Sequence, residues 1–349
     1  MGKLIKYSPK LSVYGTGLIA LDIVISSNIN EPAYQWAGGT CGNVLTILSY
    51  LGWASYPIAR LNTEPSSLHV KNDMKEWQVK LDFTTMEPTA SVPIITQENL
   101  KDKTGAPIHK FHWRNCPKCG AWLPSYKPVT LQATKIIKET GRFGNLYFFD
   151  RVSPGALDLA KYFKKMGAII FFEPSAKSDP KHFKEAISLS DIVKYSDQRF
   201  TSIISADLEK NRPALEIQTL GLNGLRYRLK KRKSWIDIPA FDVTEIIDTC
   251  GCGDWTTAGI IYKLCGTDRK SFLKKSEEKI KEAMKYGQAL GAWNCCFEGA
   301  RGGMYRVSKN SFKKDIEMIL AKGSKKLRKK SKSVDSHHVS DGLCPACSH

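Results

Sequence analysis

The stretch LYFFDRVSPGALDLAKYFKKMGAIIFF, residues 146–172, contains two short apolar runs separated by a helical pattern. The runs Leu146–Asp150 and Ala168–Phe172 have the length of buried strands, and the residues near 155–166 have the spacing of a helix. Another helical pattern follows near 181–189. Strands that alternate with helices in this way predict a parallel β-sheet flanked by helices.

The same alternation extends towards both ends of the chain. Two long helical patterns cover 254–264 and about 277–296, and near the N-terminus a strand over 11–14 precedes a helix that starts near Gly42. Further apolar residues at strand spacing are Ile192, Val193, Leu215, Ile217 and Leu220. We therefore expect an α/β fold with a central twisted, mainly parallel sheet flanked by helices.

The pattern changes between residues 64 and 130, where prolines interrupt aromatic and polar sequence and short strand-like runs such as Ser91–Thr96 occur. We interpret 64–130 as a small β-rich lid inserted into an α/β core formed by 1–63 and 131–321. Residues 322–349 are expected to form a basic flexible tail, because they are rich in charge and serine and lack apolar periodicity.

Composition limits the class of protein. The chain has 349 residues, of which 42% are hydrophobic, enough for one large core with a smaller appended part. No apolar run approaches the roughly 18 to 20 residues of a membrane span, and the N-terminal residues lack a signal-peptide pattern, so a cytoplasmic location is expected. The net charge of +19 favours anionic partners, but Lys322–Lys332 alone supplies seven of the positive charges.

The stretch Asp248-Thr249-Cys250-Gly251-Cys252-Gly253-Asp254-Trp255 precedes an apolar helix. Its two glycines permit a tight turn at the start of the helix, where free amides and the positive end of the helix dipole favour an anion. A carboxylate beside such a site can accept a proton from an attacking hydroxyl. The same residues also fit an ordinary helix start with Asp254 as a first-turn acid.

In register, residues 248–254 resemble the Asp-Thr-x-Gly-x-Gly-Asp signature of the ribokinase-like (PfkB) kinases. The resemblance implies that Asp254 is the catalytic base and that the amides of Gly251, Cys252 and Gly253 bind the phosphoryl group. It also implies that Asp248 and Thr249 lie near ATP and the monovalent cation that some members use. Cys250, Cys252 and Trp255 replace smaller residues that are commoner in the family.

A second similarity lies near the N-terminus, where Gly38-Gly39-Thr40-Cys41-Gly42-Asn43 resembles the family's Gly-Gly-x-x-x-Asn substrate motif. By this resemblance Gly38 and Gly39 admit the substrate close to the backbone, and Asn43 bonds a hydroxyl. Asp22 resembles the acid that binds sugar hydroxyls. Each residue alone could equally belong to a loop or a solvated turn.

The nucleotide side resembles the family less closely. Thr219, Gly221 and Gly224 match a Thr-x-Gly-x-x-Gly nucleotide loop, although a pair of glycines after a strand is also ordinary turn chemistry. Ala300, Gly302 and Gly303 resemble the turn on the adenine side. The family's Asn-x-x-Glu pattern for magnesium is replaced by Ser196-Asp197-Gln198-Arg199, so that Asp197 or Glu173 would have to compensate.

Two other nucleotide-binding patterns fit this sequence poorly. Gly15-Thr16-Gly17-Leu18-Ile19-Ala20 fits the dinucleotide fingerprint Gly-x-Gly-x-x-Ala, but Leu18–Ile25 has the pattern of a strand and not of the helix that the fingerprint requires. Gln35 and Trp36 also lie where an acidic residue is expected. A P-loop sequence is absent from the chain. We therefore rank a dehydrogenase below the two functions given at the end of this section, and a P-loop kinase below the dehydrogenase.

The cysteines at 116, 119, 344 and 347 form two Cys-x-x-Cys pairs, which predict a four-cysteine structural zinc site. One zinc ion would fasten the tail to the lid, within one chain or between two subunits. Alternatively, each pair binds zinc by itself or with a histidine. The candidate histidines are His109, His112, His337, His338 and His349.

Together these observations predict an ATP-dependent kinase that uses Mg²⁺ and phosphorylates a hydroxymethyl group of a sugar or nucleoside. A homodimer formed through the lid is a further expectation from the resemblance. The alternative is a nucleic-acid-binding or regulatory zinc protein on a degenerate kinase fold, favoured by the basic segment and the cysteine pairs. His112-Trp113-Arg114 could contact a substrate, but an aromatic beside such a cysteine pair more often packs a small core.

Overall fold

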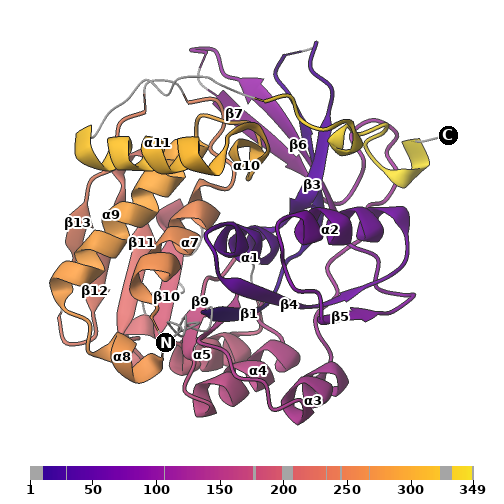
Figure 1. Cartoon of the computed structure of the whole chain (residues 1–349). Helices are drawn as coiled ribbons and strands as arrows, with labels where there is room; N and C mark the ends of the chain where they lie inside the picture. The colour runs from indigo at the N-terminus through magenta and orange to yellow at the C-terminus, as the bar shows by residue number, and fades with distance from the viewer. Residues whose placement is uncertain are drawn as a thin grey trace, which may run out of the picture.

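The structure is a computed structural model that describes residues 11–28, 30–105, 107–175, 178–198, 207–232, 234–243, 246–266, 268–322 and 332–347. Its main sheet has nine strands in the order β13-β12-β11-β10-β9-β8-β1-β4-β5, of which β12 and β13 are antiparallel to their neighbours and the others parallel. The predicted α/β class with a mainly parallel sheet is therefore confirmed (Figure 1). The strands are β1 (Ser12–Thr16), β4 (Ala54–Leu61), β5 (Phe83–Met86), β8 (Leu146–Phe149), β9 (Ile169–Phe172), β10 (Ile192–Ser196), β11 (Leu215–Thr219), β12 (Leu225–Leu229) and β13 (Ile236–Ile238).

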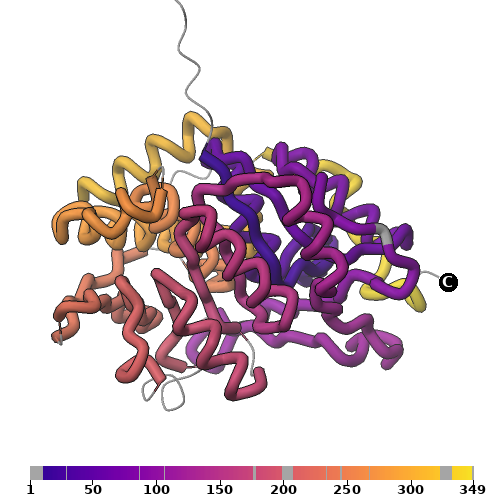
Figure 2. The backbone as a smooth tube through the Cα atoms, turned by 90° about the horizontal axis from the view of Figure 1, so that it is seen from below, coloured from indigo at the N-terminus to yellow at the C-terminus, as the bar shows by residue number. Residues whose placement is uncertain are grey.

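Helices cover both faces of this sheet (Figures 1 and 2). One group contains α1 (Thr40–Tyr50), α7 (Cys252–Leu264), α9 (Glu277–Asn294) and α11 (Lys309–Lys322), and the other contains α3 (Leu131–Glu139), α4 (Pro154–Lys165) and α5 (Pro180–Leu189). Strand β8 shows why two layers form: Leu146 and Phe148 enter the core under the first group, and Tyr147 and Phe149 enter the core under the second. Successive side chains of a strand point to opposite faces, so a wholly apolar strand needs cover on both.

The strand–helix–strand unit of 146–172 forms as its sequence predicts. Ser153 caps α4 by accepting a hydrogen bond from the Ala156 amide at 3.1 Å, and Pro154 occupies the first turn. The helix ends before Gly167, whose φ of 88° lies in the left-handed region. The local sequence signals therefore determined both ends of this helix.

A second sheet has four strands in the order β3-β2-β6-β7 and lies against one end of the main sheet (Figure 1). Its strands are β2 (Ala20–Ile25), β3 (Tyr34–Gly38), β6 (Ile94–Lys101) and β7 (Pro107–His112). The predicted bounds of the lid, 64–130, do not coincide with the residues that form this second sheet. β2 and β3 precede residue 64, whereas α2 (Pro65–Glu76) contacts this sheet and β5 joins β4 in the main sheet. Local patterns could not show that β2 pairs with β6, about 70 residues away along the chain.

The described part of the C-terminal segment, 332–347, packs against the folded body, which corrects the expectation of a flexible tail for these residues. Val339 forms a β-bridge with Tyr34, and the Ser340 amide donates to the Ala33 carbonyl at 2.8 Å. In Figure 1 this yellow segment runs beside β3 and α2. Most of the predicted basic segment, at 323–331, lies outside the described residues.

Three shorter helical segments are α8 (Arg269–Leu273), α10 (Gly302–Arg306) and the 3-10 turn η1 (Gly221–Asn223). Two further 3-10 turns, η2 (Ser336–His338) and η3 (Pro345–Cys347), lie in the C-terminal segment. None of the helices in the described ranges is both long and apolar enough to span a bilayer.

Candidate active site

A glycine turn places the start of α7 at the mouth of the predicted anion site. Gly251 precedes α7 with a φ of 74°, and a Cβ atom there would lie 2.4 Å from the Ala300 Cα. Only glycine meets both demands, because other residues rarely adopt this backbone conformation and would collide with the turn at Ala300. The amides of the first turn of a helix have no partner within it, and Gly253 is exposed.

Asp254 lies in this first turn and contacts Asn43 across the molecule. The Asn43 Nδ2 donates to Asp254 Oδ2 at 2.7 Å, although the two residues are 211 positions apart. Asn43 is buried in the first turn of α1, which follows Gly38 and Gly39. The structure therefore brings the centres of the two predicted motifs into direct contact.

The environment of Asp254 favours a carboxyl group that exchanges its proton near neutral pH. Removal from water raises the pKa of Asp254 to about 7, and the nearby carboxylate of Glu173 adds to the rise. The hydrogen bond from Asn43 and the charge of Lys194 act in the opposite direction and hold the pKa lower than burial alone would. A pKa near the working pH is what a general base requires.

Lys194 is a buried cation that the sequence analysis did not single out. Its Nζ lies 2.5 Å from Glu173 Oε1 and within 3.8 Å of where a Cβ on Gly253 would lie, so its positive charge adjoins the first turn of α7. Thr257 donates to the second oxygen of Glu173, also at 2.5 Å. The one sequence signal for Lys194 was its position in the apolar strand β10, because a lysine in a buried strand requires a partner.

Asp22 lies on β2 beside the two glycines at the end of β3. A Cβ on Gly38 would lie 1.8 Å from Asp22 Oδ2, so this glycine leaves room for the carboxylate. The Gly39 amide donates to the same oxygen at 3.4 Å. Burial raises the pKa of Asp22 to about 6, and within the described ranges its Oδ1 has no hydrogen-bond partner.

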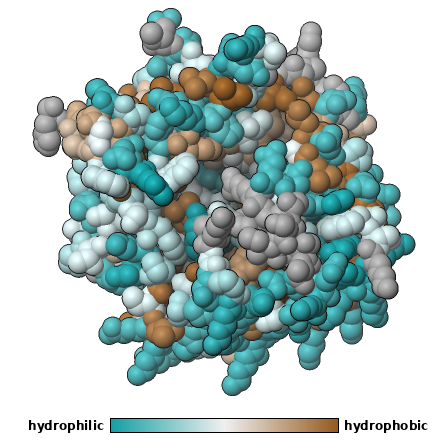
Figure 3. Space-filling view, turned by 180° about the vertical axis from the view of Figure 1, so that it is seen from behind, coloured by the Kyte–Doolittle hydropathy of each residue, from teal (hydrophilic) through white to brown (hydrophobic). Residues whose placement is uncertain are grey.

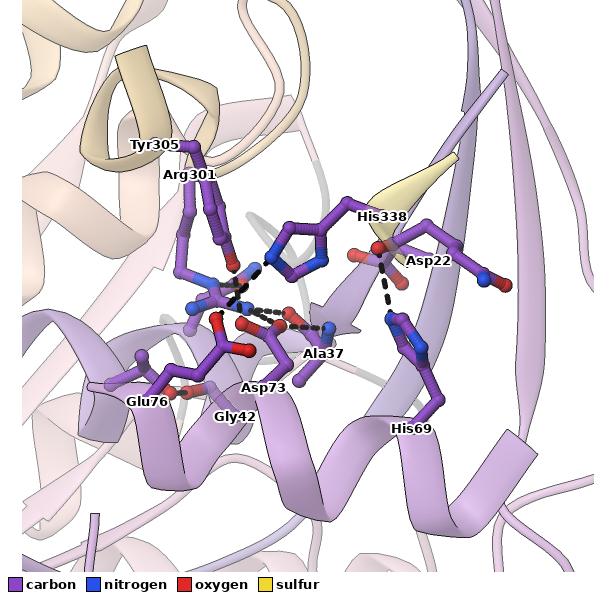
Figure 4. Close-up of polar contacts among 12 residues, drawn as sticks. Asp22, Ala37, Gly42, His69, Asp73, Glu76, Arg301, Tyr305 and His338 are labelled. Atoms are coloured by element: carbon purple, nitrogen blue, oxygen red, sulfur yellow. Dashed lines mark hydrogen bonds and ion pairs between the residues drawn. The ribbon is translucent and has the colours of Figure 1, made fainter. Parts of the chain in front are cut away.

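Behind Asn43 lies Arg301, a fully buried residue that the motif comparison did not single out. Its Nε donates to Asn43 Oδ1 at 3.2 Å, and its Nη2 contacts Asp73 Oδ2 at 2.8 Å and the Ala37 carbonyl. The Tyr305 hydroxyl donates to the other oxygen of Asp73 at 2.7 Å. Figure 4 shows Arg301 and Tyr305 converging on Asp73. Arg301 therefore fixes which way the Asn43 amide is turned, with its NH₂ group towards Asp254.

The Gly15–Ala20 segment does not have the structure of a dinucleotide-binding turn. Strand β2 follows it where the fingerprint requires a helix. A Cβ on Gly17 would lie 1.6 Å from Asp150 Oδ1, and that oxygen accepts a hydrogen bond from the Leu18 amide at 2.9 Å. The glycine is thus explained by close approach of a buried carboxylate.

Comparisons with known proteins bear on the fold that carries this site. No protein-family model matches the sequence. An Arabidopsis thaliana protein named "Probable fructokinase-6, chloroplastic" is 24% identical over 319 residues, covering 84% of this chain and 79% of that protein. Fructokinase with bound ATP from Xylella fastidiosa aligns with a TM-score of 0.65 at 16% identity, over 83% of this chain and 93% of that one. Aminoimidazole riboside kinase from Salmonella enterica also gives 0.65 at 16% identity, over 87% and 99%.

The chain has a ribokinase-like fold. In this fold the contact between Asn43 and Asp254 joins the first turns of α1 and α7. The ribokinase-like fold that the glycine motifs implied is thereby confirmed, whereas the roles of the individual residues stay predictions.

In this ribokinase-like fold, Asp248 connects the second sheet with two turns. Its Oδ1 accepts from the Cys250 amide and its Oδ2 from the Gly299 amide, both at 2.8 Å. Gln97 on β6 donates to Oδ2 at 2.6 Å, and His109 on β7 lies 3.7 Å from Oδ1. This carboxylate therefore orders the turn before α7, while a cation near Asp248 and Thr249 remains a prediction.

The predicted nucleotide loop forms a tight turn. Thr219 ends β11, Gly221 begins η1, and the Leu220 amide donates to the Gly224 carbonyl at 2.8 Å. Gly224 has a φ of 90°, and a Cβ there would lie 2.3 Å from the Ile238 carbonyl oxygen. Turn geometry alone thus explains Gly224, and a role in ATP binding stays a prediction.

The segment in place of the family's magnesium pattern follows β10. Ser196 ends this strand, and its hydroxyl donates to Asp197 Oδ1 over a long 3.4 Å contact. Arg199 lies outside the described residues. Glu173, the other carboxylate considered as a replacement, already contacts Lys194 and Thr257 through its two oxygens.

Proposed function

We propose that this protein is an ATP-dependent kinase that phosphorylates a hydroxymethyl group of a sugar or nucleoside, with Asp254 as the general base. The observation that carries the proposal is the 2.7 Å contact between Asp254 and Asn43 at the start of α7. It joins the residue proposed to remove a proton to the residue proposed to hold the acceptor. Similarity to sugar kinases in sequence, and to sugar and nucleoside kinases in fold, supports the same activity.

In the proposed reaction, the acceptor oxygen forms a bond to the γ-phosphorus of ATP while the bond from that phosphorus to the β–γ bridging oxygen breaks. Asp254 takes the hydroxyl proton, and ADP leaves with the electron pair of the broken bond. The amides of Gly251, Cys252 and Gly253 donate to the phosphoryl oxygens, and the charge of Lys194 beside Gly253 attracts them. Positioning and charge stabilisation of this kind account for most of the catalysis in phosphoryl transfer.

On the acceptor side, Asp22, Gly38, Gly39 and Asn43 are proposed to hold the sugar. The unpartnered Oδ1 of Asp22 can accept a hydrogen bond from a substrate hydroxyl, which would relieve an unsatisfied buried oxygen. Gly38 keeps this carboxylate accessible, since a larger residue would occupy its place. These groups recognise hydroxyls and do not distinguish a free sugar from the ribose of a nucleoside.

The proposed cofactors are ATP and Mg²⁺, with a monovalent cation near Asp248 and Thr249. Mg²⁺ prefers oxygen ligands and keeps several waters when it accompanies nucleotide phosphates. Asp197 and Glu173 are the carboxylates at the ends of β10 and β9 that could contact those waters. Because Glu173 already contacts Lys194 and Thr257, the phosphates would supply most of the ligands of the Mg²⁺ ion other than water. The predicted zinc site takes no part in this chemistry.

The experiment is a panel of sugars and nucleosides incubated with radiolabelled ATP, with wild-type protein and Asp254→Asn in parallel. We expect one acceptor class to be labelled by the wild type and kcat to fall by about 10²- to 10⁴-fold in the variant. Nucleotide binding, measured by calorimetry, should persist. Unchanged turnover in Asp254→Asn would overturn the assignment of the base.

The same assay separates the kinase from the alternative of a nucleic-acid-binding or regulatory protein. Salt-sensitive RNA binding with no transfer to any acceptor would favour that alternative. A matched control is Asp237→Asn, because Asp237 is exposed on β13, outside the site described above. Equal loss of activity in both variants would indicate a general defect and count against a specific role of Asp254.

A further inference from the structure

Four cysteine side chains from opposite ends of the chain meet outside the proposed active site. Cys116 and Cys119 follow β7, whereas Cys344 and Cys347 lie near the C-terminus, and their four sulfur atoms all lie within 4.8 Å of one another. The Sγ–Sγ distances are 3.6 Å for Cys116–Cys347, 3.4 Å for Cys119–Cys344 and 3.6 Å for Cys344–Cys347. Among the described residues, no other group contains four such ligands.

These distances are those of thiolates around a metal ion. Four sulfurs at about 2.3 Å from a tetrahedral Zn²⁺ are separated from one another by about 3.8 Å. A disulfide would require a separation of about 2.0 Å. The cluster therefore has the spacing of a zinc-tetrathiolate site and not of two cystines.

The local backbone holds each pair of thiols independently of a metal. In the first pair, the Gly120 amide donates to the Cys116 carbonyl at 2.9 Å, and Gly120 has a φ of 75°. In the second pair, the Cys347 amide donates to the Cys344 carbonyl, also at 2.9 Å. Each turn brings its two cysteines to the same side, as in structural zinc sites built from Cys-x-x-Cys.

The histidines considered as alternative ligands have other partners. His112 contacts Glu98 at 2.9 Å, and His109 lies beside Asp248. His337 and His338 both contact Glu76, at 2.8 and 3.4 Å, and His349 lies outside the described residues. The ligand set within the described residues is therefore four thiolates, which are soft ligands that suit Zn²⁺.

We propose that Cys116, Cys119, Cys344 and Cys347 bind one structural Zn²⁺ within a single chain, and that this ion fastens the C-terminal segment to the loop after β7. The inference concerns a site separate from the proposed kinase chemistry and does not depend on it. A closed site of four thiolates leaves no position open for substrate, so the ion contributes to folding and not to catalysis.

The fastened segment supports the face on which the Asp73–Arg301 pair lies. The ring of His338 packs 4.8 Å from that of Tyr305, and the Tyr305 hydroxyl bonds Asp73. Figure 4 shows His338 joined to Glu76 and lying beside Asp73 and Arg301. Because Asp73 holds Arg301, loss of the zinc would loosen the packing on one side of the residue that orients Asn43.

The first test measures the zinc content of the purified full-length protein by inductively coupled plasma mass spectrometry, after growth with added Zn²⁺. We expect about one zinc per chain in the wild type and in Cys296→Ser, a partly exposed cysteine outside the cluster. Cys119→Ser and Cys344→Ser should each retain little zinc after dialysis. Substitution with Co²⁺ should give the visible absorption of tetrahedral thiolate coordination in the wild type and in Cys296→Ser, and not in Cys119→Ser or Cys344→Ser.

The second test asks whether the ion fastens the segment. A chelator should lower the Tm of the wild type towards that of Cys344→Ser, and should not change the Tm of a chain that ends before Val334. Absence of zinc from the wild type, or retention of zinc by both serine variants, would overturn the proposal. So would an intact mass that is lower by the hydrogens lost in two disulfides. None of these results would bear on phosphoryl transfer, which the Asp254→Asn assay tests separately.

Discussion

At the scale of single residues, the hydrogen bond from Asn43 to Asp254 influences the pH at which the proposed base becomes charged. This bond stabilises the carboxylate and opposes the effect of burial, which raises the pKa of Asp254 to about 7. Removing the donor in Asn43→Ala should therefore raise that pKa further. In a plot of kcat/KM against pH, we expect the rising limb to move to higher pH. We also expect a higher KM for the acceptor.

The control for this prediction is Asn211→Ala, because Asn211 is an exposed asparagine outside the site described above. Its pH profile should coincide with that of the wild type. A profile of Asn43→Ala with an unchanged midpoint would show that the contact does not stabilise the carboxylate in solution.

The same carboxyl group links stability to pH. The pKa of Asp254 in the folded protein, about 7, lies above its ordinary value. Between about pH 4 and 7 the folded state therefore keeps a proton that the unfolded state has already released. Stability from this group is therefore present at low pH and is lost as pH rises through 7. Asp22, with a pKa raised to about 6, acts in the same direction.

Asp254→Asn should consequently be more stable than the wild type above pH 7, by on the order of 1 to 3 kcal/mol, while the difference should vanish near pH 4. Chemical denaturation at several pH values measures this difference. A constant difference across pH would contradict the assigned shift.

At the scale of elements, glycines determine how closely α7 approaches α9. A Cβ on Gly259 would lie 2.7 Å from the Gly287 Cα, and one on Gly287 would lie 2.6 Å from the Thr256 carbonyl oxygen. Each contact is with backbone, which cannot move aside as a flexible side chain can. The close packing of α9 thus holds the helix whose first turn forms the proposed anion site.

Gly287→Ala should therefore force the two helices apart and lower the free energy of unfolding by about 1 to 3 kcal/mol. In the control Gly266→Ala, the nearest atom to the added Cβ is the flexible Lys275 Nζ at 3.8 Å, so a change within about 0.5 kcal/mol is expected. Urea denaturation compares the two variants. Equal effects would show that the α7–α9 contact tolerates an extra methyl group.

At the scale of the whole molecule, the second sheet and the loop that follows it expose apolar side chains. Ile108 on β7 is 47% exposed and Trp122 is 82% exposed. In the view of Figure 3, apolar groups gather along the upper part of the face, and smaller ones are scattered among the hydrophilic residues below. A homodimer through the lid stays a prediction, and such exposed apolar side chains are the kind of surface that it would bury. Light scattering after size exclusion should show a dimer that Ile108→Lys weakens, and a monomeric wild type would contradict the prediction.

Local sequence patterns determined much of the main sheet, because each signal acts within a few residues. The apolar runs of β8 and β9, the Ser153 cap and Gly167 act over one strand or one helix, so periodicity and turn chemistry suffice to predict them. The glycines before Asp254 likewise indicate a tight turn at a helix start. Only the resemblance to a known family joined these local signals into a candidate active site.

Tertiary structure decided everything that depends on contacts between distant segments. It paired β2 with β6, put Lys194 beside Gly253, and placed Arg301 behind Asn43, 258 residues away along the chain. A buried charge is stable only with a partner, and the partner of Arg301 is Asp73, which no periodicity or spacing could identify. Cysteine spacing predicted the two Cys-x-x-Cys pairs as metal ligands, but only the folded chain could bring their four sulfurs together.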